Sequence, residues 1–279
     1  MIAACTRRHL LFAAGALATL GSRAAHAADD RFALTGQPTQ GGWLRGHLPP
    51  GASGLRLDDR DLAHAPDGVF LLAFDRDSPP QAVLSAQAAA GPISQIIAVA
   101  PRAWQIEHVN TPMHPPGMAD AEFARRRSAE LAQIGAARRH DTGAQGWRQM
   151  MMRPAHGPLS GRFGAQRVFR GVPAAYHGGL DLAAPAGSAI LAPADGVVVL
   201  AAAGEPFTLE GHLVIVDHGM GLNSAMLHAR ALHVTEGTVL RQGDTIGEVG
   251  MTGRATGPHL HWALNWHGRK LDPLLFLAA

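Results

Sequence analysis

The chain has 279 residues, of which 47% are hydrophobic and 16% charged, and this composition excludes a mostly disordered polypeptide. Its 24 basic and 22 acidic residues leave a formal net charge of +2, too small an excess to indicate a nucleic-acid partner. The single cysteine excludes a disulfide-stapled scaffold and a cysteine-based zinc cluster. The 16 histidines instead favour a metal site built from imidazole and carboxylate groups.

Residues 1–27 have the three parts of an export signal. Arg7 and Arg8 precede an apolar run that ends at Gly21, and Ala25-His26-Ala27 supplies the small residues of a cleavage site. The apolar run of about a dozen residues is shorter than the roughly 20 that a membrane-spanning helix needs. The adjacent arginines favour the twin-arginine route over an ordinary signal. We therefore predict an exported protein, periplasmic or cell-wall associated, with no stable membrane span after cleavage.

Residues 28–112 are predicted to form a small β domain. The runs at residues 69–74 and 96–99 are rich in strand-forming side chains, and turns that contain Pro or Gly separate such runs. Short strands at this spacing are typical of a β-sandwich. No cluster of catalytic residue types occurs in this part of the sequence.

Residues 113–158 are predicted to be a helix followed by a linker. Apolar side chains recur at helical intervals over residues 120–139, among Glu, Arg and Ala, which indicates one amphipathic helix. We expect the arginines from Arg125 to Arg127 to lie on its solvated face. Residues 141–158 are rich in Gly, Gln, Met and Pro and are predicted to lead into a new domain.

Residues 159–279 are predicted to form a third, all-β region, because short apolar or alternating runs are bounded by Gly or Pro. The fold class is therefore mainly β, with a C-terminal antiparallel sheet or sandwich, a smaller β-sandwich-like domain before it and one connecting helix. Four motifs with metal-binding or catalytic side chains fall in this region. They are Tyr176-His177-Gly178-Gly179-Leu180-Asp181, Val216-Asp217-His218-Gly219, Met226-Leu227-His228 and Pro258-His259-Leu260-His261-Trp262.

In two of these motifs the spacing brings ligands to one face of a strand. His177 and Asp181 are four residues apart, and the two glycines between them argue against a helix, so we expect an extended segment. His259 and His261 are two residues apart and are expected to project together, with Leu260 on the opposite, buried face. Two histidines and one aspartate would leave the fourth position of tetrahedral zinc open, as in catalytic sites.

Together these motifs resemble the lysostaphin-type, or LytM-like, zinc metallopeptidases. The resemblance covers residues 161–266, a little under half of the chain. It is carried by His177-Gly178-Gly179-Leu180-Asp181, Ala192-Pro193-Ala194-Asp195-Gly196, Val216-Asp217-His218-Gly219, Gly250-Met251-Thr252-Gly253 and Gly257-Pro258-His259-Leu260-His261. It implies an open antiparallel sheet with a groove that runs across one zinc ion per chain.

The resemblance also implies a role for five residues. His177, Asp181 and His261 correspond to the zinc ligands, and His228 and His259 to the catalytic histidines. The sequence does not assign the general base to one of the two, and both alternatives stay open.

The surroundings of His228 depart from the family pattern. The chain has Met226 where tyrosine is common and Ala229 where leucine is common. Its only tyrosine, Tyr176, adjoins a predicted ligand and cannot take that place. We expect different local packing and the same role for the histidine.

The implied function is hydrolysis of peptide cross-links in peptidoglycan, with stem peptides as substrates. The alternative is a non-catalytic protein that binds the cell wall or activates a cell-wall amidase. Because all five ligand and catalytic residues are present, the enzyme is favoured. The resemblance further implies that an upstream segment can cover the zinc, and His140, Asp141 and His156 are candidates for this by position.

Overall fold

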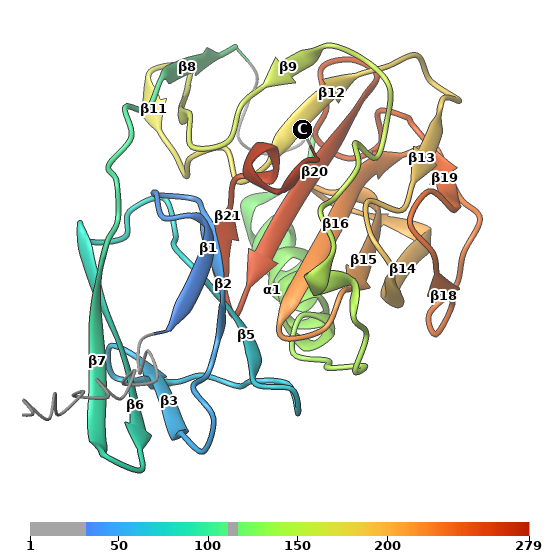
Figure 1. Ribbon diagram of the computed structural model, residues 1–279. Helices are drawn as coiled ribbons and strands as arrows, with labels where there is room; N and C mark the ends of the chain where they lie inside the picture. Colours follow the sequence, from blue (N-terminus) through green and yellow to red (C-terminus); the bar gives the residue numbers. More distant parts are fainter. Residues whose placement is uncertain (1–31, 111–116, 279) are drawn as a thin grey trace, which may run out of the picture. The chain divides into compact units, whose positions relative to one another are not determined.

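The structure is a computed structural model that describes residues 32–110 and 117–278; the predicted export signal lies outside these residues. The described residues are mainly β and include one α-helix, as the sequence predicts (Figure 1). None of the helices in this part of the chain is long and apolar enough to cross a membrane.

Two small antiparallel sheets form the N-terminal part. Their strands are β1 (Ala33–Gln37), β2 (Trp43–His47), β3 (Ser53–Leu57), β4 (Arg60–Asp61), β5 (Val69–Ala73), β6 (Gln81–Ala88) and β7 (Gly91–Ala98). One sheet has the order β1-β2-β5 and the other β4-β3-β6-β7. On β6, Ala82, Leu84 and Ala86 are buried and alternate with exposed residues such as Val83, the pattern of a strand with one face on a core.

The largest sheet contains eight strands, all in antiparallel pairs (Figure 1). They are β9 (Leu159–Gly161), β12 (Leu180–Ala183), β14 (Gly196–Phe207), β15 (Gly211–Asp217), β16 (Leu222–Ala229), β18 (Val239–Leu240), β20 (His259–Trp266) and β21 (Arg269–Leu271). The order is β18-β14-β15-β16-β20-β12-β9, with β21 paired to β20. Leu260, Trp262 and Leu264 on β20 are fully buried, so His259 and His261 project from the opposite face, as predicted.

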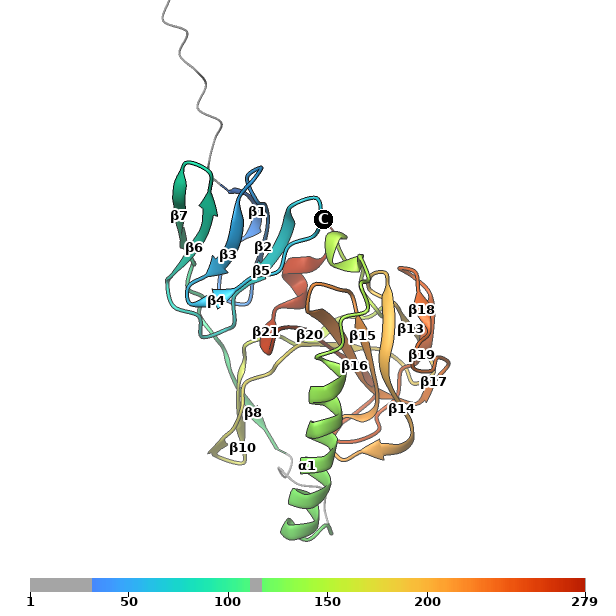
Figure 2. The ribbon, with the colours of Figure 1, turned by 90° about the horizontal axis from the view of Figure 1, so that it is seen from below.

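The helix α1 (Asp120–Ala137) lies beside the sheet, along β14 to β16 (Figure 2). Its acidic first turn, with Asp120 and Glu122, complements the positive end of the helix dipole. The helix buries its apolar side in a cluster with the sheet: Ile134, Ala137, Leu200, Phe207, Leu213, Ile215 and Ala225. The predicted solvated face is correct for Arg125 but wrong for Arg127, which is largely buried against the sheet because it pairs with Glu210.

Residues 141–158, predicted to be a linker, pack into the core. They include the 3₁₀ helix Gly146–Arg148, in which Trp147 is fully buried. The backbone N–H of Trp147 donates to the carbonyl of His218 at 2.9 Å, and Met151 is buried as well. A second 3₁₀ helix, Pro273–Phe276, follows β21.

Two three-stranded sheets complete the architecture. One has the order β13-β19-β17 and the other β11-β10-β8. Their strands are β8 (Ile106–Val109), β10 (Gln166–Phe169), β11 (Val172–Pro173), β13 (Ala189–Leu191), β17 (Ala231–Leu232) and β19 (Thr245–Glu248). The pairing of β8 with β10 is parallel and places Glu107 opposite Arg167, so a segment that precedes α1 borders the C-terminal region.

Candidate metal centre

Three buried side chains converge at the junction of β12 and β20. Asp181 and His261 are directly opposite each other in the antiparallel pair, and His177 lies just before β12. The Nδ1 atom of His261 is 2.7 Å from Oδ1 of Asp181. The Nε2 atom of His177 is 3.0 Å from the same oxygen and 3.0 Å from Nδ1 of His261. The predicted ligands are thus brought together.

His177 is positioned by a loop, although we expected it on a strand with Asp181. Its backbone N–H donates to the carbonyl of Ala165 at 2.8 Å, and the N–H of Gly164 donates to the carbonyl of His177 at 2.9 Å. Its Nδ1–H donates to the carbonyl of Arg162 at 3.0 Å. This last bond fixes the tautomer that directs the Nε2 lone pair at the cluster.

The donor set fits a metal ion. A hydrogen bond between two of the three ligand atoms needs a proton on one of them, and each contact has room for only one proton. A cation at the centre can instead interact with the lone pairs of all three atoms at once. Zinc bonds of about 2.0–2.1 Å in a tetrahedron separate neighbouring ligand atoms by about 3.3 Å, close to the observed triangle. Gly161 and Gly179 leave room for the cluster, because a Cβ at Gly179 would lie 2.9 Å from Nε2 of His261. His177, Asp181 and His261 could therefore hold a metal ion.

The electrostatics also suit metal binding. Burial opposes ionisation of Asp181, but the hydrogen bonds with His177 and His261 outweigh it and hold the pKa of this carboxyl well below its usual range. Burial lowers the pKa of His261, which favours its neutral form. Ionised carboxylate and neutral imidazole are the forms that bind metals.

His228 and His259 stand beside the cluster with their rings 4.8 Å apart. The Nδ1–H of His228 donates to the carbonyl of Thr252, and that of His259 to the carbonyl of Gly257, each at 2.8 Å. Both therefore keep Nε2 free of the backbone, and Nε2 of His259 lies 3.9 Å from Oδ1 of Asp181. Burial, with the nearby His261 and His259, lowers the pKa of His228 to about 3.

The backbone at His228 is unusual. It lies near the end of β16 with φ of 66°, in the left-handed region that side chains other than glycine rarely adopt. Its N–H donates to the carbonyl of Glu210 at 2.9 Å, which holds this conformation. Strain of this kind persists where the surroundings enforce it and is common at functional sites. Met226, the predicted departure from the family pattern, is fully buried two residues earlier.

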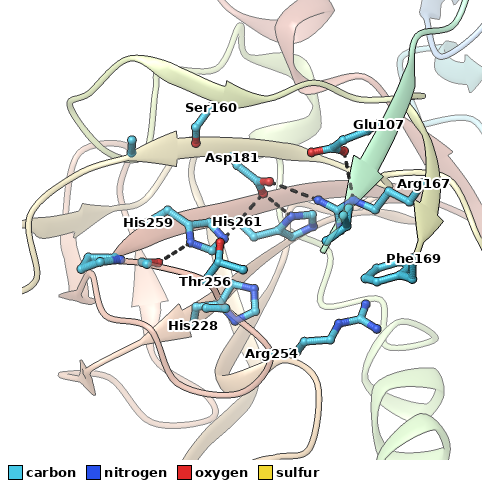
Figure 3. Close-up of a pocket in the computed structure, with 15 residues that line it drawn as sticks. Glu107, Ser160, Arg167, Phe169, Asp181, His228, Arg254, Thr256, His259 and His261 are labelled. Carbon is cyan, nitrogen blue, oxygen red and sulfur yellow. Dashed lines mark hydrogen bonds and ion pairs between the residues drawn. The ribbon is translucent and has the colours of Figure 1, made fainter. Parts of the chain in front are cut away.

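A cavity of about 320 Å³ opens over the cluster (Figure 3). Asp181, His228, His259 and His261 line it together with Glu107, Ser160, Arg167, Phe169, Arg254 and Thr256. Arg167 is 3.3 Å from Oδ2 of Asp181 through Nη2 and 3.2 Å from Oε2 of Glu107 through Nε. From the sequence alone, Arg167 could equally be a contact for an anionic substrate or a solvated loop charge, and Glu107 was missed, because the parallel pairing of β8 with β10 leaves no motif.

The remaining candidates take other positions. The buried carboxylate of Asp217 accepts hydrogen bonds from the backbone and hydroxyl of Thr142, and His218 is held between Asp195 and Ser224, which makes this motif structural. The candidate occluding residues His140, Asp141 and His156 are exposed and line neither the cavity over the cluster nor the one beneath α1.

The C-terminal part of the chain is similar in sequence to known proteins. Over 98 residues the chain is 39% identical to DD-carboxypeptidase/endopeptidase Mpg of Neisseria meningitidis serogroup B, which covers 35% of this chain and 22% of that protein. Over 100 residues it is 37% identical to peptidoglycan DD-endopeptidase ShyA of Vibrio cholerae, covering 36% and 23%. The chain thus spans less than a quarter of the length of these relatives.

The likeness to a solved structure is more extensive. A crystal structure of a Pseudomonas aeruginosa protein assigned to peptidase M23 matches with a TM-score of 0.66 and 29% identity, over 86% of this chain and 95% of that one. Residues 175–273 match the model of Peptidase family M23 and include all five residues of the site. The predicted resemblance is thereby confirmed, and the C-terminal part of the chain is a domain of Peptidase family M23.

Proposed function

We propose that this protein is an exported, zinc-dependent endopeptidase that hydrolyses peptide cross-links of peptidoglycan. The observation that carries the proposal is the convergence of His177, Asp181 and His261, with donor atoms within 3.0 Å of one another, beside two further histidines. The names of the relatives Mpg and ShyA support a DD-peptide bond and a peptidoglycan substrate.

His177, Asp181 and His261 would hold one Zn²⁺ per chain. When bound there, zinc supplies Lewis acidity that polarises the scissile carbonyl and makes a water molecule more acidic. His228 and His259 divide the proton transfers: each keeps its Nδ1 proton on a carbonyl, which leaves Nε2 to take a proton from the attacking water or return one to the leaving amine. Arg167 orients Asp181 through its contact with Oδ2.

The arrangement favours an enzyme over a non-catalytic wall-binding protein or amidase activator. A binding protein needs neither two free Nε2 atoms beside the cluster nor a strained backbone at His228. Both features are what proton transfer at a fixed position requires.

Two measurements test the proposal on protein that lacks residues 1–27. The purified protein should contain about one zinc per chain, His261→Ala should lose the metal, and His259→Ala should keep it but lose turnover. His156→Ala, which changes an exposed histidine far from the motifs in sequence, is the matched control. Digestion of purified peptidoglycan, followed by mass analysis, should reveal new stem-peptide termini. If zinc-loaded protein releases nothing from walls of several cross-link types, the enzyme proposal fails.

The export proposal depends on residues 1–27. Fractionation of cells should place the protein outside the cytoplasm, and replacing both Arg7 and Arg8 by lysine should retain it inside if the twin-arginine route is used. Export of the double variant at the normal level would instead indicate the general route.

A further inference from the structure

A second cavity, of about 360 Å³, lies beneath α1 and reaches the same cluster. Its walls come from α1 and from β15, β16 and β20, and His177, His228 and His261 stand at one side. His228, His261, Arg167 and Arg254 line both this cavity and the one above the cluster. A substrate centred on the cluster therefore has room in two directions, and the second direction leads under the helix.

This second cavity has a cationic lining. Among its cations, Arg127 is neutralised, since it forms a two-pronged pair with Glu210 at 2.6 and 2.7 Å and also contacts Glu130. Arg138 and Lys270 differ from it: neither side chain has an ion pair or a hydrogen bond to any described residue. The Nε atom of Arg138 is buried without a hydrogen-bond partner among the described residues, and Nζ of Lys270 lies 4.9 Å from the centre of the Tyr176 ring.

These two cations are partly buried and influence each other. Burial is the main reason that the pKa of Lys270 lies below its usual value; Asp75 opposes the shift and the charge of Arg138 adds to it. Burial likewise lowers the pKa of Arg138, and the charge of Glu210 opposes this shift without forming an ion pair with it. Charges withdrawn from water without a partner are costly, and an anion placed between them would offset that cost.

Lys270 lies close to the cluster of proposed metal ligands. Its side chain passes over Gly178, which adjoins His177: a Cβ at Gly178 would lie 3.0 Å from Cδ and 3.6 Å from Nζ of Lys270. The ammonium group is thus next to the cluster rather than at a distant rim. The floor beside it is apolar and consists of Leu213, Ile215, Ala225, Leu227 and Ala263.

We propose that the cavity beneath α1 is a subsite for the substrate residue that supplies the leaving amine, and that Arg138 and Lys270 bind the carboxylate of that residue. The apolar floor suits the aliphatic part of the same residue. This inference rests on the proposed function, since it names the part of the substrate that the site selects. Arg138 and Lys270 are specificity residues in it and take no part in proton transfer.

The test uses two probes that differ in one group. They are a blocked Lys-D-Ala-D-Ala peptide with a free terminal carboxylate and the same peptide as its carboxamide. The wild-type protein should favour the carboxylate in kcat/KM by about 10- to 100-fold, the range expected for hydrogen bonds to a charged group, and mainly through KM. Arg138→Gln and Lys270→Gln should each narrow this ratio. Arg125→Gln, on the same helix with its side chain 74% exposed, should leave it unchanged.

A binding measurement separates this inference from the proposed function. Calorimetric titration of zinc-loaded His259→Ala protein with each probe needs no turnover and should show the same preference for the carboxylate. The inference would be overturned if the two probes bind with equal affinity. It would also be overturned if Arg138→Gln and Lys270→Gln reduce the affinity for both probes by the same factor. If neither probe nor peptidoglycan is cleaved by the wild type, the proposed function fails, while the binding preference still decides the assignment of the subsite.

Discussion

The substitution Gly161→Ala should weaken metal binding without altering any proposed ligand. Gly161 ends β9, pairs with Asp181 across the sheet edge and has no left-handed backbone, so alanine adds only a methyl group. That Cβ would lie 2.4 Å from Oδ2 of Asp181 and 2.8 Å from Cε1 of His177. The methyl group therefore points into two of the three proposed ligands.

The magnitude follows from this geometry. Real Cβ atoms essentially never approach a neighbour within 3.0 Å, so Asp181 and the new methyl group must move apart by several tenths of an ångström. Metal–ligand distances tolerate only about 0.2 Å. Disturbing groups that orient ligands costs about 10- to 100-fold in metal affinity, or roughly 1.4–2.8 kcal/mol. We expect Gly161→Ala to fall within that range.

Competition with a chromophoric zinc chelator would measure the affinity. Gly204→Ala is the matched control, because a Cβ there meets nothing within 4 Å and the glycine has no left-handed φ. Denaturant unfolding of the metal-free proteins should confirm that both variants fold. If folded Gly161→Ala binds zinc as tightly as the wild type, the inferred closeness of Gly161 to the metal ligands is wrong.

Three further changes test the packing and electrostatics around the site. Arg127→Gln breaks the largely buried pair with Glu210 and should lower the free energy of unfolding, measured in urea, by about 2–3 kcal/mol. The control Arg125→Gln should lower it by less than about 0.5 kcal/mol. Equal effects of the two substitutions would contradict the inward position of Arg127. Trp147→Ala should cost about 3–5 kcal/mol, because the ring is fully buried, and a loss below about 1 kcal/mol would indicate a loose linker. In the metal-free protein, His228 has a pKa of about 3 when folded and about 6.5 when unfolded, so the unfolded state gains a proton first and stability falls as the pH drops below about 6.5. Between pH 7 and pH 5, His228→Gln should reduce the fall in the free energy of unfolding by about 2 kcal/mol. An unchanged fall would show that another group causes it.

Much of the site could be predicted because strand geometry repeats every two residues. The spacing of His259 and His261 places both side chains on one face, and Leu260 between them is fully buried. The same rule failed for His177, since β12 begins only at Leu180 and the histidine is held by hydrogen bonds to a distant loop. Hydrogen bonds between loops follow no regular spacing in a sequence, so they cannot be predicted from it.

Features that depend on tertiary packing were out of reach for the same reason. The inward turn of Arg127 depends on where Glu210 lies, 83 residues later. The burial of Trp147 in a segment rich in Gly and Pro depends on the turn that carries His218. Composition describes such segments as linkers because it measures local preference, and here long-range contacts outweigh that preference.

The parallel pairing of β8 with β10 brings a residue from outside the range 175–273 to the cavity over the cluster. Residues 175–273 contain the five histidine and aspartate residues of the site. Glu107, which lines the cavity over the cluster, and Arg138, which lines the cavity beneath α1, precede that range. Recombination that carried only residues 175–273 into another chain would transfer these five residues and leave Glu107 and Arg138 behind. Changes before residue 175 can therefore alter the lining of both cavities while the five residues of the site stay the same.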